Sequence, residues 1–178
     1  KNAIDTAQFT VTTFSAVDTT LTVADSTDFD VSDLLLIDAE LLSITAVSGN
    51  DVSVTRGQLS TAATSHAAAS DITLIEPTAS VTTIDEGGTF TDSDTTLTVT
   101  SVASLSVSTN DYIRIDDEIL RVTAIAGDDL TVTRAQLGTS AAAHTNSSTV
   151  TKQTVTANKT TINESTSTGV SAPIIKNL

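Results

Sequence analysis

The sequence predicts an all-β protein, built of two tandem small antiparallel β-barrel or sandwich domains with extended terminal arms. Three observations support this prediction. Thr and Ser supply 36 and 21 of the 178 residues while aromatic residues make up only 3%, and the β-branched Thr and Val suit a pleated strand better than a helix. Apolar and polar residues alternate with a period of two, without the 3.6-residue period of a helix. The chain also repeats itself.

The repeat is visible in three hexapeptides of the first half that return in the second half. They are DTTLTV of 18–23 at 94–99, IDAELL of 37–42 at 115–120 (as IDDEIL), and VTRGQL of 54–59 at 132–137 (as VTRAQL). The two histidines, His66 and His144, fall at equivalent positions. Since the motif TTIDE of 82–86 also returns as TTINE at 160–164, a third copy is predicted to begin there and stop.

These matches predict the domain organisation. Pro77 supports a boundary because proline cannot donate to a strand ladder and biases the preceding residue to an extended conformation. The predicted segments are an N-terminal arm (1–7), a first β domain (8–76), a linker (77–79), a second β domain (80–152), and a C-terminal segment (153–178) that is either an extended arm or a truncated third repeat.

Within the second unit, alternation places strands near residues 97–99, 112–115, 120–124 and 130–133. A two-residue turn at 116–117 pairs Ile113 with Leu120 and Tyr112 with Arg121, which keeps each apolar set on one face; a three-residue loop mixes the faces. A second hairpin turn is expected at 127–128, equivalent to 49–50 in the first unit.

The two units differ on the face that points outward. Leu34 and Leu36 in the first unit correspond to Tyr112 and Arg114 in the second. Exposed apolar pairs usually mark contacts, so the leucines are expected to pack on the N-terminal segment or the neighbouring unit, or to form a contact between subunits. The interface candidates are Leu34, Leu36, Tyr112, Arg114, Arg121, and, as strand-addition anchors in the C-terminal arm, Ile174 and Ile175.

An arginine and a histidine stand ten residues apart in a loop of small residues in both copies. These pairs are Arg56 with His66, and Arg134 with His144. A histidine base with an arginine clamp is one interpretation, but a long loop of small residues must also satisfy its own backbone, for which Arg and His are suitable donors. We assign all four residues a loop-stabilising role and predict no catalytic residue, no cofactor and no enzymatic activity.

Carboxylates cluster in two kinds of place. Tip carboxylates at 38–40 and 116–118 are too few for a tight cation site. A denser group lies in the first unit alone, where a weak calcium site and a solvated acidic loop are both open interpretations, the second being favoured. This group consists of Asp25, Asp28, Asp30 and Asp33. No metal ligand is therefore assigned.

Charge and composition exclude several partners and chemistries. The chain has 22 Asp and Glu against 8 Lys and Arg, a formal charge of −14, whereas nucleic acids and anionic membranes require a basic surface. It contains no Cys, which excludes disulfides and thiol catalysis. No apolar run is long enough for a membrane-spanning helix, and no signal-peptide pattern is present.

The motifs resemble a module that occurs in tandem in structural proteins of tailed bacteriophages. The resemblance rests on IDDEIL (115–120), LTVTR (130–134), LGT (137–139) and His144, covers most of 18–152, and departs from the usual pattern at Ser60 and Ala135, where glycine is usual. It implies a non-enzymatic component of the virion exterior, namely a capsid decoration, tail or fibre protein. The implied partners are copies of this chain, as a homo-oligomer, and other virion proteins.

Two other classes of protein fit parts of the sequence. A cell-surface or extracellular filament subunit of a prokaryote, built of tandem β modules, is the main alternative. A carbohydrate-binding module is less favoured, since the chain has no Trp and a single Tyr, Tyr112, whereas sugar sites generally use aromatic faces.

Overall fold

The computed structural model describes residues 10–11 and 13–166, and over these residues the protein is all-β, which confirms the predicted fold class. The predicted N-terminal arm (1–7) and the anchors Ile174 and Ile175 lie outside the described residues. The elements are β1 (Thr10–Val11), β2 (Thr20–Thr22), β3 (Leu34–Ile37), β4 (Glu40–Ser48), β5 (Asp51–Thr55), β6 (Asp71–Thr83), β7 (Thr96–Thr98), α1 (Val102–Leu105), β8 (Tyr112–Ile115), β9 (Glu118–Ala126), β10 (Asp129–Thr133), β11 (Thr149–Thr161) and β12 (Ser165–Thr166).

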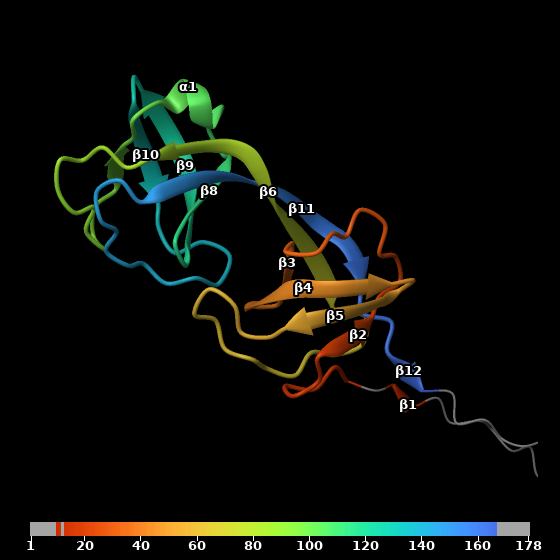
Figure 1. Cartoon of the computed structure of the whole chain (residues 1–178). Coiled ribbons are helices and arrows are strands. Elements are labelled where there is room, and N and C mark those ends of the chain that lie inside the picture. The colour runs from red at the N-terminus through yellow and green to blue at the C-terminus, as the bar shows by residue number, and fades with distance from the viewer. Residues whose placement is uncertain (1–9, 12, 167–178) are drawn as a thin grey trace, which may run out of the picture.

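Ten of these strands form one antiparallel sheet in the order β2-β5-β4-β3-β6-β11-β8-β9-β10-β7. The order is symmetric about its centre, because each strand of the first half has its equivalent strand at the matching position of the second half. The equivalent pairs are β2 and β7, β5 and β10, β4 and β9, β3 and β8, and β6 and β11. The 13-residue strands β6 and β11 lie at the centre and run side by side between the two lobes of the molecule (Figure 1).

The local registers agree with the sequence. Tyr112 pairs with Arg121 and Ile113 with Leu120, which confirms the two-residue turn at 116–117. The second hairpin is also confirmed, because Ala126 pairs with Asp129 across the two residues 127–128. Alternation and turn length therefore specify these hairpins without help from the rest of the chain.

The central strands exchange their ends between the repeats. β6 starts beside β3 in the first half and ends in the second, where Ile84 forms a bridge with Val99. β11 starts beside β8 in the second half and ends in the first, where Ile162 forms a bridge with Val23. Each half of the sheet thus curls back to meet the end of a strand from the other half.

Their pairing is symmetric about the pair formed by Glu76 and Thr154, so β6 and β11 play equivalent parts. The two apolar clusters show the consequence. Ile162 lies in the cluster of the first half and Ile84 in the cluster of the second, at 2% and 1% exposure. The core of the second half is built from residues 84–150, whereas the core of the first half also needs Ile162 from the far end of the chain.

The segments predicted between and after the two domains form strands in the structure. Residues 153–161, predicted as part of an arm or of a truncated third repeat, lie in β11. Residues 160–164 resemble 82–86, and Ile162 takes in the first core the place that Ile84 takes in the second.

The two ends of the described chain meet at one end of the molecule. Thr10 pairs with Thr166 and Val11 with Ser165, as β1 and β12 (Figure 1). In the second half, one continuous segment supplies both Ile84 and Phe90, and Phe90 forms a bridge with His144. In the first half, the equivalent residues come from the two ends of the chain: Ile162 replaces Ile84, and Phe14, in a bridge with His66, replaces Phe90.

A third apolar cluster joins the two halves. Its buried members come from both repeats, and partly buried side chains, among them Leu36 and Tyr112, pack against it. The interpretation in which Leu34 and Leu36 pack on the neighbouring unit therefore describes the structure. The buried members are Leu34, Leu41, Leu59, Ile75 and Ile119.

The same junction explains why the two loops kept different glycines. A Cβ on Gly138, at φ +84°, would lie 2.7 Å from the carbonyl oxygen of Ala39 in the first repeat. Gly57, at φ +61°, would place a Cβ 3.1 Å from the carbonyl oxygen of Thr61. Gly138 is thus required by a contact between the repeats, whereas Gly57 is favoured by its own loop.

Replacement of Gly138 by alanine should therefore weaken the junction. Gly138→Ala adds left-handed strain and a backbone clash, and we expect a loss of about 2 kcal/mol in the free energy of unfolding, measured by urea denaturation. Gly127→Ala is the matched control, since Gly127 has φ +66° with open space around its Cβ position. Equal losses in the two variants would contradict a role for the contact with Ala39.

Candidate functional site

The arginine and histidine of the first loop converge on a buried glutamate. Glu40 is 1% exposed, and its carboxylate oxygens lie 2.7 and 2.8 Å from Nε and Nη2 of Arg56. The backbone N–H groups of Gly57 and Thr64 donate to the same carboxylate at 3.0 and 2.9 Å. His66 Nε2 completes the set at 2.9 Å. Five nitrogens thus surround one carboxylate.

The second repeat builds the same centre. Glu118 is fully buried and lies 2.8 and 2.7 Å from Nε and Nη2 of Arg134. The backbone N–H groups of Ala135 and Ala142 donate at 3.0 and 3.1 Å, and His144 Nε2 lies at 2.9 Å. The near identity of the two sets shows that the loop sequence specifies this geometry.

Each centre also reaches outward and toward the chain that precedes it. In the first centre, His66 Nδ1 lies 2.7 Å from the exposed carboxylate of Asp38. The ring of Phe14 stacks on His66, and the guanidinium of Arg56 lies 4.2 Å from the centroid of that ring. Arg56 Nη1 donates to the carbonyl oxygen of Ser15 at 2.6 Å. The centre therefore joins a hairpin turn, a loop and the segment before β2.

Local sequence places these groups. The two-residue turn at 38–39 puts Glu40 opposite Ile37 at the start of β4. The loop after Arg56 bends through left-handed conformations at Gly57, Leu59 and Ser60, which turns its N–H groups toward the carboxylate, as backbone nests do for anions.

Hydrogen bonds outweigh burial in setting the acidity of both glutamates. Burial alone raises the pKa of Glu40, but the hydrogen bonds from Arg56, Thr64, His66 and Gly57 lower it from 4.5 to about 2. Burial likewise raises the pKa of Glu118, and its donors, Arg134 and His144 first, lower it to about 2. Both side chains are thus anionic partners of buried arginines.

The sequence pointed to the arginines and histidines but missed the glutamates on which they converge, because the carboxylates at 38–40 were interpreted as exposed tips. The available signal was their position, since Glu40 precedes Arg56 by the same interval at which Glu118 precedes Arg134. As Arg56 and His66 both bind Glu40, their arrangement is that of an internal ion cluster.

The acidic loop of the first repeat uses its carboxylates locally. Asp25 accepts from the N–H of Thr27 at 2.9 Å, and Asp33 from the N–H of Asp30 at 2.9 Å. Asp28 pairs with Lys159 at 2.8 Å. Within residues 10–11 and 13–166, no group of three or more His, Asp or Glu side chains is placed to hold a metal ion.

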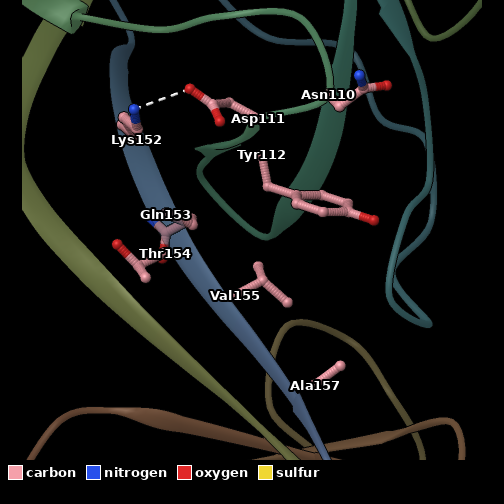
Figure 2. Close-up of a pocket in the computed structure, with 8 residues that line it drawn as sticks. All are labelled: Asn110, Asp111, Tyr112, Lys152, Gln153, Thr154, Val155 and Ala157. Atoms are coloured by element: carbon pink, nitrogen blue, oxygen red, sulfur yellow. Dashed lines mark ion pairs between the residues drawn. The ribbon is translucent and has the colours of Figure 1, made fainter.

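Of the remaining interface candidates, Tyr112 lines a groove, and Arg121 contacts Asn110, another of the lining residues. Arg121 Nη2 donates to Asn110 Oδ1 at 2.6 Å, and Arg114 Nε donates to the carbonyl oxygen of Asp116 at 2.7 Å. The groove has a volume of about 500 Å³, and Figure 2 shows the ring of Tyr112 beside β11. Its lining residues are Asn110, Asp111, Tyr112, Lys152, Gln153, Thr154, Val155 and Ala157.

Comparisons with known proteins leave the chain without an assigned family. No protein-family model, no curated protein and no solved structure matches it. In the part of the chain that the structure describes, no helix has the length and apolar character needed to cross a membrane.

The two glutamates should make stability sensitive to acid. Their pKa values are lower in the folded protein than the ordinary 4.5, so their contribution is complete above pH 4.5 and is lost as the pH falls from there to about 2. Each contributes about 3 kcal/mol at neutral pH. Urea denaturation at a series of pH values should show this loss, and a Glu40→Gln variant should show a smaller one. If the free energy of unfolding fell equally with pH in the parent and in Glu40→Gln, the assigned role of Glu40 would be contradicted.

The arginines should not tolerate lysine. Arg56→Lys keeps the charge but removes the two-pronged contact with Glu40 and the contact with Phe14, so we expect a loss of about 3 kcal/mol in the free energy of unfolding. Arg114→Lys is the control, because its hydrogen bond is exposed, and it should change stability by less than about 0.5 kcal/mol. Similar losses in both variants would show that the Glu40 centre is not a main source of stability.

Proposed function

We propose that this chain is a non-enzymatic structural component of the exterior of a bacteriophage virion, of the capsid decoration, tail or fibre type. The observation that carries the proposal is the antiparallel pairing of β6 with β11, which joins two repeats into one body whose two described chain ends lie side by side. Such a body acts as a building block that is attached to a larger assembly at one end.

The chemistry of the two charged centres supports a structural role. Arg56 and His66 bind Glu40, and Arg134 and His144 bind Glu118, so these side chains are engaged within the protein. The residues that most resemble catalytic groups hold loops to hairpins. The resemblance of the repeats to tandem modules of phage structural proteins supports a phage particle as the assembly to which the chain belongs.

The formal charge of −14 supports the choice of partners. An acidic surface keeps many copies soluble before assembly and disfavours binding to nucleic acid or to anionic lipid. The partners in this proposal are copies of this chain, forming a homo-oligomer, and other proteins of the virion.

Cryo-electron microscopy of the native particles, with Fab fragments raised against the purified chain, tests the proposal. We expect regular Fab density on the outside of heads, tails or fibres, and no density when the Fab is first saturated with free protein. Fab density on prokaryotic cell-surface fibres, with none on phage particles, would overturn the proposal in favour of the filament alternative.

A further inference from the structure

The strand β11 has one edge that is only partly paired. On one side it pairs with β6, and on the other it pairs with β8 from Val150 to Gln153 only. Tyr112 is the partner of Gln153 and the first residue of β8. Among the described residues, none pairs with Thr154 or Val155 on this side.

The direction of the backbone groups at this edge follows from the regular pairing of residues 153–156 with β6. Gln153 pairs with Pro77, which has no N–H, so these two residues cannot exchange a pair of main-chain hydrogen bonds and Gln153 presents its main chain to the opposite edge. Because main-chain groups alternate between the two edges of a strand, Val155 presents its main chain to the same edge as Gln153. Val155 thus offers an N–H and a carbonyl on the open side of β11.

The equivalent edge of β6 is protected. Glu76 and Pro77 occupy the positions that correspond to Thr154 and Val155 in the other repeat. A charged residue and a proline are two devices by which proteins prevent pairing at a strand edge. The protein has both devices on β6 and neither on β11, although the two strands are related by the internal symmetry.

The open edge also faces a space of suitable shape. The groove of about 500 Å³ is lined by Tyr112 and Val155, and it lies on the side of β11 that faces away from β6 (Figure 2). Tyr112 and Val155 both pack against the apolar cluster that joins the repeats. A short strand placed here would continue the line of β8 and bury its side chains against this cluster.

We propose that the C-terminal segment 167–178 of a second copy of this chain adds as a short strand to the open edge of β11 at Thr154 and Val155. The segment carries Ile174, Ile175 and the basic Lys176 and has no Asp or Glu. It is thus apolar enough to fill the groove and has the charge opposite to that of the chain as a whole. Main-chain pairing supplies affinity in such additions, and side-chain pockets supply specificity.

The position of the segment favours a second copy over the same chain. Residue 166 lies in β12, beyond the end of β11. To reach Val155, the segment of the same chain must first run back along β11 from Thr161, about 20 Å at the rise of a strand. Because residue 166 lies beyond Thr161, the path is longer than this and uses more than half of the twelve-residue segment before the groove is reached. A second copy avoids this path.

This inference rests on the proposed function, in that it supplies the contact by which copies assemble. Sedimentation velocity on the full chain over a wide range of concentration is the test. We expect the weight-average mass to rise to at least twice that of one chain. Val155→Pro and Thr154→Glu, which copy the residues of β6, and the double variant Ile174→Asp with Ile175→Asp should each remain monomeric.

Thr156→Glu is the matched control, since it adds the same charge to an exposed threonine of β11 outside the groove lining, and it should assemble like the parent. Thermal melting checks that each variant is folded, and Thr154→Glu serves as the test should Val155→Pro unfold. A parent chain that stays monomeric, or a folded Thr154→Glu variant that assembles normally, would overturn the inference.

Amide hydrogen exchange identifies the occupant. Protection of the Val155 N–H that rises with protein concentration and is lost in the Ile174/Ile175 double variant is expected. Protection in a monomer would overturn the second copy in favour of the chain's own segment. If the Fab fragments label virions but the purified chain does not self-associate, this inference alone is overturned. If the chain self-associates but the Fab fragments do not label virions, only the proposed function is overturned.

Discussion

The antiparallel pairing of β6 with β11 is the constraint on which the rest of the structure depends. It joins the two repeats within the ten-stranded sheet, and β11 leads the chain back so that Ile162 enters the core of the first half. Because the first core lacks Ile162 without this return, and because the cluster between the halves has members from both repeats, separating the halves would expose apolar surface. The two halves therefore depend on each other for stability, although each repeat has its own hairpins.

The buried glutamates solve a different problem, that of long loops made of small residues. Such loops bury little apolar surface, and their backbone N–H groups require partners. Glu40 accepts two of these N–H groups and holds Arg56 and His66, so one anion replaces an apolar core at this place. A buried charge is costly unless its hydrogen bonds are satisfied, and five donors meet that condition. The same contacts fix the Phe14 segment.

Much of the fold could be predicted from the sequence because it is local. The register of Tyr112 with Arg121 follows from alternation and a two-residue turn. The strand exchange could not be predicted, since the similarity of 82–84 to 160–162 does not say which core each segment enters. Pro77 indicated a domain boundary, yet it lies inside β6. Its position in β6 corresponds to that of Val155 in β11, whose N–H faces away from β6. The N–H that Pro77 lacks would likewise face away from β11, so its absence costs no hydrogen bond between the two strands. The burial of Glu40 depends on contacts up to 26 residues away.

The return of β11 also completes the first core. In the first half, Ile162 and Phe14 fill the places that Ile84 and Phe90 fill in the second, so both cores of the described chain are occupied. The edge of β11 at Thr154 and Val155 breaks the internal symmetry, because the charged residue and the proline that protect the equivalent edge of β6 are absent there. This difference between two otherwise equivalent strands is why we propose β11, and not β6, as the strand to which a second copy adds.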